Sequence, residues 1–116
     1  MSLPINFEHL ISEATSLDLY TNLIVQLNKD LLFANIDLEF DIDTLPTSLK
    51  LVLQDCVLEL ITSKFSEYLN LLYQVDVSEI KIRGLDGTDP LKLSEDVTFL
   101  ILQREWQKVW YRNKHK

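Results

Sequence analysis

The sequence predicts an all-α fold: a single compact bundle of four or five helices with an extended connection over residues 34–45. Two observations favour this class. Only two glycines and three prolines occur in 116 residues, and apolar residues recur at intervals of three and four along most of the chain. The length suits one domain, which we expect to cover residues 1–116.

The N-terminal quarter predicts two helices. Phe7 and Leu10 share one face of a short first helix, for which Asn6 is the expected N-cap. A second helix runs from about residue 17 to 33, with leucines recurring on its inward face. We expect residues 1–5 to be disordered or derived from an expression vector.

Residues 36–43 alternate strictly between apolar and acidic side chains, which is typical of an extended segment with one buried face. The second alternating stretch is residues 79–83. We favour an extended strap that lays its apolar side chains over the helices. The alternative is an α+β fold in which residues 36–42 and 79–83 pair as a two-stranded ribbon, although an isolated ribbon is marginally stable.

The longest predicted helix covers residues 47–75, and the rest of the chain would wrap around it. Almost its whole circumference is apolar, so it requires neighbours on several sides. Thr62 and Ser63 lie mid-way, where hydroxyl groups that bond back to the main chain can bend a helix. A narrow polar stripe is formed by Asp55, Glu59, Thr62, Ser66 and Asn70.

Two further helices are expected after residue 75. Ser78 is the expected N-cap of a short helix that ends near Leu85. The last helix begins near Leu91, or at a cap formed by Ser94, and ends near Arg112. We expect residues 113–116 to form a frayed basic tail.

The charge of the chain is unevenly distributed. The net charge is −7, but residues 1–103 carry six basic and seventeen acidic residues, a net −11, whereas residues 104–116 carry a net +4. The body would repel nucleic acid and anionic lipid, and only the tail could attract them. No apolar run approaches the ~20 residues of a membrane span, and no signal-peptide pattern is present, so we expect a cytoplasmic protein.

Two motif-like stretches lack the residues that their chemistry requires. Residues 37–43 imitate the first ligands of a calcium loop, but Ile42 and Ser48 stand where that loop needs glycine and glutamate. Residues 85–88 are similar to the Asp-Gly-Thr signature of haloacid-dehalogenase-like phosphatases. Gly84 stands where their nucleophilic aspartate would fall, so an Asp-Gly turn is the better interpretation.

No pattern identifies a catalytic, cofactor or metal site. His9 and His115 have no neighbouring ligand set, and Cys56 falls on the apolar face of its helix, as a small buried hydrophobe does. Acid–base chemistry among scattered carboxylates stays open. We expect no cofactor and no metal, and we do not expect an enzyme.

The last helix carries the candidate contact residues. Its basic and aromatic side chains could form a contact surface for nucleic acid, a membrane or a protein. In the favoured interpretation, the two tryptophans pack into the core and the cations offset the helix macrodipole. The candidates are Arg104, Trp106, Lys108, Trp110, Tyr111 and Arg112.

Three motifs occur in a characteristic order along residues 17–112: Tyr-Leu-Asn-Leu-Leu-Tyr at 68–73, Val-Asp-Val-Ser-Glu at 75–79, and Arg-Glu-Trp-Gln-Lys at 104–108. In this order the chain resembles a family of short, uncharacterised bacterial proteins. The resemblance implies a helical fold and a bacterial cytoplasmic protein. It implies no activity, cofactor or site residue.

The expected function is that of a non-enzymatic helical protein-interaction module that associates with itself. Val25, Phe33 and Leu69 fall outside the predicted inward faces, so more apolar surface remains than five helices cover. A symmetric homodimer is the commonest way to cover such a surface. The alternative is a nucleic-acid-associated protein that uses the basic, aromatic C-terminal tail. We expect no membrane partner.

Overall fold

The computed structural model describes residues 2–115 and confirms the all-α fold. Helices account for 73% of the chain, against about one third in an ordinary globular protein. There are six helices within residues 2–115 rather than four or five, because the predicted central helix is divided in two. They are α1 (Phe7–Ser16), α2 (Tyr20–Phe33), α3 (Pro46–Ser63), α4 (Phe65–Val75), α5 (Glu79–Arg83) and α6 (Pro90–Lys114).

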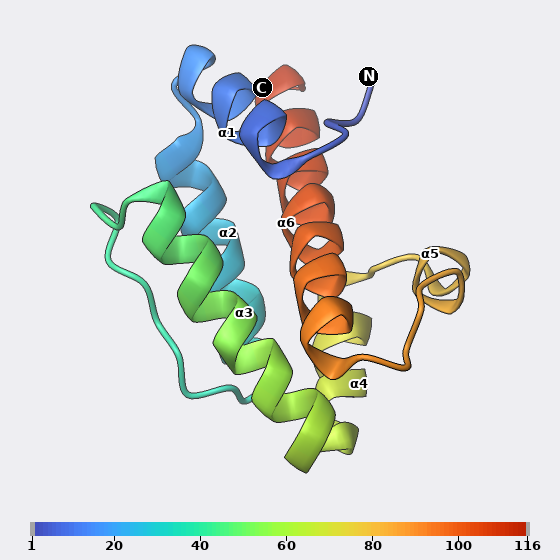
Figure 1. The fold of residues 1–116 in the computed structure, drawn as a ribbon. Coiled ribbons are helices and arrows are strands. Elements are labelled where there is room, and N and C mark those ends of the chain that lie inside the picture. The colour runs from blue at the N-terminus through green and yellow to red at the C-terminus, as the bar shows by residue number, and fades with distance from the viewer. Residues whose placement is uncertain (1, 116) are drawn as a thin grey trace.

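The longest helix, α6, occupies the centre of the molecule in place of the predicted helix over 47–75. It packs against α1, α2, α3 and α4, whereas α5 lies to one side on a loop (Figure 1). The core that these helices enclose is made mostly of leucine, isoleucine and valine, with two alanines and the aromatic residues Phe40, Tyr68 and Trp106. Its fully buried large side chains include Leu10, Leu23, Ile24, Leu27, Leu31, Leu49, Leu53, Leu71, Ile101, Leu102 and Trp106.

The predicted helix over 47–75 breaks at Lys64, whose φ of −143° and ψ of 59° are not helical. The Thr62 hydroxyl donates to the carbonyl of Leu58 at 2.9 Å, which is the back-bonding expected at this position. The break changes the phase of the following helix. Phe65, one of the apolar residues of the predicted helix, is exposed, whereas Leu71 is fully buried.

Residues 34–45 form the favoured strap, and the two-stranded ribbon is wrong: residues 79–83 are helical, and residues 2–115 contain no strand. Asn28 of α2 holds the strap through both main-chain groups of Phe40. Its Nδ2 donates to the Phe40 carbonyl, and its Oδ1 accepts from the Phe40 N–H, both at 2.8 Å. The Tyr20 hydroxyl donates to the carbonyl of Thr44 at 2.6 Å.

Several helix ends follow local capping rules. Asn6 accepts a hydrogen bond from the N–H of His9 at 2.8 Å, and Ser78 caps α5, as predicted. The helix α2 begins at Tyr20 rather than near residue 17. The helix α6 begins at Pro90, within one residue of the predicted start near Leu91, and its cap is Asp89 rather than Ser94.

The two ends of the chain contact the bundle. Pro4 is buried, and its carbonyl accepts a hydrogen bond from Gln103 Nε2 at 2.8 Å, which anchors the N-terminal segment that we expected to be disordered. At the other end, α6 continues through Lys114, and His115 is its C-cap. Residues 1 and 116, which belong to the predicted disordered start and frayed tail, lie outside the described residues.

Candidate functional site

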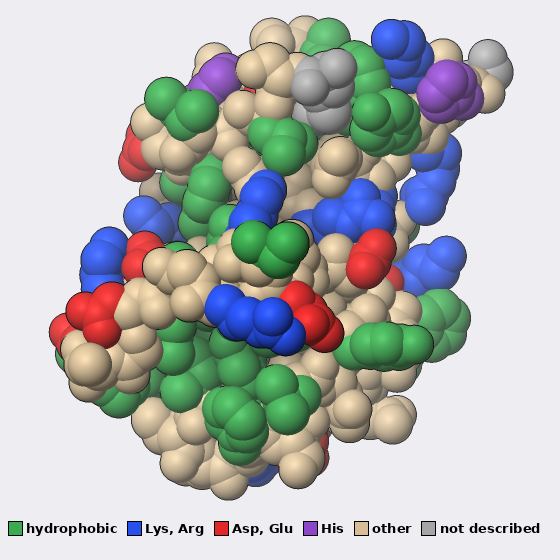
Figure 2. Space-filling view, turned by 90° about the vertical axis from the view of Figure 1, so that its right-hand side faces the viewer, with side chains coloured by type: hydrophobic (Ala, Val, Ile, Leu, Met, Phe, Trp, Pro, Cys, Tyr) green, Lys and Arg blue, Asp and Glu red, His purple; other side chains and the backbone are tan. Residues whose placement is uncertain are grey.

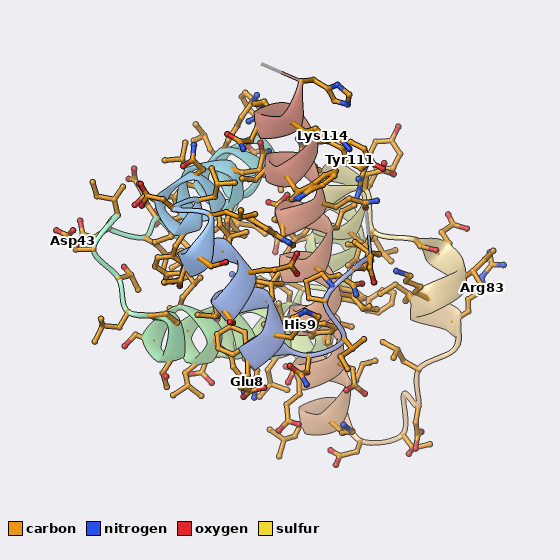
Figure 3. All side chains as sticks on the ribbon, turned by 90° about the horizontal axis from the view of Figure 1, so that it is seen from above. Glu8, His9, Asp43, Arg83, Tyr111 and Lys114 are labelled. Carbon is orange, nitrogen blue, oxygen red and sulfur yellow. The ribbon has the colours of Figure 1, made fainter. Side chains whose placement is uncertain are left out.

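The structure separates the aromatic residues of the predicted contact surface. Trp106 is fully buried in the core, and Trp110 is half-buried against it. Tyr111 is 43% exposed, near the C-terminal end of α6, where Figure 3 also places Lys114. Lys114 Nζ lies 4.8 Å from the centroid of the Trp110 ring. Tyr111 is thus the one aromatic side chain of the three that is exposed.

Arg104 binds the end of α4. Its Nε donates to the Asp76 carbonyl at 3.1 Å, and its Nη2 donates to the Asp76 carboxylate at 2.9 Å. Asp76 is the C-cap of α4 in the left-handed conformation, with a φ of 69°. A cation at this position compensates the negative end of the helix macrodipole. Arg104 therefore joins α6 to α4.

Lys108 points into the bundle, and its side chain is only 18% exposed. Its Nζ donates to Asp30 Oδ2 of α2 at 2.7 Å. Arg112, by contrast, is exposed. Of the three candidate cations, two are therefore engaged in contacts between helices and one is exposed to solvent.

Lys108 belongs to a buried polar cluster that joins α2, α4 and α6. The cluster comprises Asp30, Gln26, Gln74, Glu105 and Lys108. Gln26 Nε2 and Gln74 Nε2 each donate to the Asp30 carboxylate at 3.2 Å. Lys108 Nζ lies 3.1 Å from Glu105 Oε1, which is an ion-pair distance. Glu105 itself is fully buried, so its protonation state depends on these neighbours.

Burial, reinforced by the neighbouring Asp30, raises the pKa of Glu105 to about 9, although Lys108 acts in the opposite direction. Glu105 is consequently protonated at neutral pH. A protonated carboxyl group can donate a hydrogen bond to the Asp30 carboxylate, whereas Lys108 Nζ, 3.1 Å from Oε1, favours the ionised form. Burial alone would raise the pKa of Asp30, but hydrogen bonds from its neighbours, Glu105 foremost, lower it.

The sequence pattern does not by itself reveal this polar cluster. A signal was present, because Glu105 lies four residues after Ile101 and four before Val109, on the buried face of a helix. A carboxyl group at such a position must find a partner or stay neutral. The partner, Asp30, lies 75 residues earlier, so the pattern alone could not name it.

The most exposed apolar surface surrounds a groove between α4 and α5. This α4–α5 groove has a volume of about 700 Å³, and its apolar lining is made of Leu69, Leu72, Tyr73, Val77 and Ile82. In Figure 2, which views the side of the molecule on which α5 lies, hydrophobic side chains gather in a hollow below a row of charged ones. Tyr73 is 88% exposed, and Ile80 beside the groove is 81% exposed.

Charged residues of both signs form the rim of the α4–α5 groove. Asp76, Glu79 and Arg83 line it. Arg83 Nη2 donates to Glu79 Oε2 at 3.1 Å, and both side chains are largely exposed. An apolar floor with a polar, solvent-exposed rim is the usual organisation of a protein–protein contact site.

Comparisons with protein-family models, curated proteins and solved structures find no match to this chain. The resemblance to short bacterial proteins therefore stays a prediction. Within residues 2–115, no three side chains of His, Cys, Asp or Glu are grouped so that they could hold a metal ion. In the same part of the chain, no helix has both the length and the apolar character needed to cross a membrane.

Proposed function

We propose that this protein is a non-enzymatic helical interaction module that associates with a second copy of itself. The α4–α5 groove is the observation that carries this proposal. Apolar side chains of this groove, among them Leu69 and Tyr73, remain exposed to solvent in the packed six-helix fold. A contiguous apolar patch with a polar rim is typical of a surface that binds another protein.

The three residues outside the predicted inward faces support the same function. Leu69 lines the groove and is 51% exposed, whereas Val25 and Phe33 lie on α2 and are 54% and 59% exposed. Among soluble oligomers, the symmetric dimer is the commonest arrangement that covers such surfaces. A bacterial cytoplasmic setting, taken from the resemblance, is part of the proposal.

Nucleic-acid association through the C-terminal tail is the second candidate, and it has less support. Arg104 and Lys108 both form ion pairs inside the protein, so their charge is already compensated. Arg112 and Lys114 remain exposed at the end of α6. Two such cations neutralise few phosphates and give weak, salt-sensitive binding.

Sedimentation equilibrium of the full chain at micromolar concentrations tests the proposal. We expect a species of twice the mass of one chain, whose proportion rises with concentration as mass action requires. A clean monomer throughout that range would contradict self-association. Fluorescence anisotropy with duplex DNA tests the second candidate in the same buffer.

A further inference from the structure

The α4–α5 surface carries both a groove and the side chains that could fill it. Tyr73 and Ile80 are the two most exposed large apolar side chains among the described residues. Tyr73 lines the groove, and Ile80 lies in α5 between the lining residues Glu79 and Ile82. Leu72 and Val77 are nearly buried and form part of its floor. In an interface with two-fold symmetry, the same patch of each copy must complement itself. A groove beside projecting apolar side chains meets this requirement.

The charge of this segment also suits a second copy. Residues 64–83 carry three basic and three acidic side chains, a net charge of zero in a chain of net −7. Residues 34–59, which include the strap, carry six acidic side chains and one basic, a net −5. Two copies that met through the strap would repel each other, whereas two copies that met through α4 and α5 would not.

The two surfaces lie on opposite sides of the molecule. Figure 3 places Asp43 of the strap at one edge and Arg83 of α5 at the other, with the bundle between them. Contact through α5 therefore keeps the acidic straps of two copies far apart. Because salt limits electrostatic interactions to about 8–10 Å, repulsion between the straps would be weak in that arrangement.

We propose that a second copy of this chain docks on the α4–α5 groove across a two-fold axis. Tyr73 and Ile80 of each copy pack against the groove of the other. Glu79 of one copy pairs with Arg83 of the other, so the intramolecular pair of each copy is exchanged for a pair across the interface. This inference rests on the proposed self-association and adds to it the surface and the symmetry.

Paired substitutions test the surface. Ile80→Ser removes an 81% exposed side chain beside the groove, and Leu32→Ser removes a 70% exposed one from the end of α2. The two changes delete the same number of apolar atoms at exposed helical positions, so Leu32→Ser is the matched control. In sedimentation equilibrium we expect Ile80→Ser to weaken dimerisation by at least about tenfold and Leu32→Ser by less than about twofold.

The possible outcomes are distinct. A wild-type monomer removes the proposed function together with this inference. A wild-type dimer that Ile80→Ser leaves intact retains self-association but overturns docking on the groove. A dimer weakened equally by Leu32→Ser also overturns it. Circular dichroism establishes that each variant keeps the helical content of the wild type.

Charge reversal tests the symmetry. Glu79→Arg alone places arginine against arginine twice in the proposed dimer, and Arg83→Glu alone places glutamate against glutamate twice. Each single variant should therefore dimerise less tightly than the wild type. A mixture of the two should recover association, because both pairs across the heterodimer interface are then attractive. A mixture that associates no better than its components refutes the two-fold arrangement.

Discussion

Replacing Glu105 by glutamine should remove a pH dependence of stability that the wild-type protein shows between pH 6 and pH 8. Glu105 of α6 is fully buried beside Lys108 of the same helix and Asp30 of α2, and its pKa is raised to about 9. In the unfolded chain the same carboxyl group ionises near its ordinary value of 4.5. Glutamine has nearly the same shape and remains neutral at every pH, and its amide group can still donate to Asp30.

The sign of the effect follows from the protons bound in each state. Between the two pKa values the folded protein keeps the Glu105 proton and the unfolded protein has released it. The stabilisation by this group is therefore fully present below the unfolded pKa and is lost as the pH rises towards about 9. Each pH unit in that interval corresponds to about 1.4 kcal/mol, so the wild type should lose on the order of 3 kcal/mol between pH 6 and pH 8.

Urea denaturation at pH 6, 7 and 8 measures this loss. The free energy of unfolding of Glu105→Gln should change much less over the same range. Glu95→Gln, an exposed carboxyl group on the same helix, is the matched control and should retain the wild-type slope. If the wild type and Glu105→Gln had equal slopes, Glu105 would be ionised in the folded protein and the protonated assignment would be wrong. The infrared band of a protonated carboxyl group, present in the wild type and absent in Glu105→Gln, gives an independent measurement.

Three further predictions concern packing, the strap and the tail. Leu60 is buried, so Leu60→Ala should lower the free energy of unfolding by about 2–5 kcal/mol. Glu59 is exposed, so Glu59→Ala should change it by less than about 0.5 kcal/mol. Urea denaturation that ranked the two variants in the opposite order would show that α3 presents a different face to the core. Asn28→Ala removes both hydrogen bonds to the main chain of Phe40 and should lower the free energy of unfolding by about 1–3 kcal/mol. Hydrogen exchange at the Phe40 amide should become faster, and unchanged exchange would mean that other contacts hold the strap. Duplex DNA should bind no more tightly than micromolar at physiological salt in fluorescence anisotropy, and a nanomolar, salt-resistant complex would make nucleic-acid association the leading function.

Local sequence signals were reliable where one helix end or one helix face decided the outcome. Asn6 and Ser78 cap the helices that they were predicted to cap, because a cap requires only a side-chain oxygen within three residues of a free N–H. The polar stripe from Asp55 to Asn70 is exposed throughout. The strap was also favoured correctly over the ribbon, since a lone pair of strands has too little support in a helical protein.

The error in helix phase lies at the break near Lys64. Thr62 was recognised as a position that could bend the predicted helix over 47–75, but a bend and a complete break have the same sequence signature. The break at Lys64 rotates the inward face, so Leu71 replaces Phe65 in the core. Packing of α4 against α2, α3 and α6 decides between these alternatives, and no pattern within the helix itself reports it.

The fold class, most helical faces and several helix ends follow from local sequence patterns, because hydrophobic periodicity and capping act over a few neighbouring residues. Which polar groups meet depends instead on how the helices pack. Asp30 accepts from Gln74 and Lys108, which lie 44 and 78 residues further along the chain. The α4–α5 groove likewise depends on how far α5 stands from the bundle, a distance set by its two connecting loops (Figure 1). These polar contacts and the groove arise from the packing of whole helices. A charged group that this packing buries without a partner would destabilise the fold, so buried charges lie next to groups that compensate them.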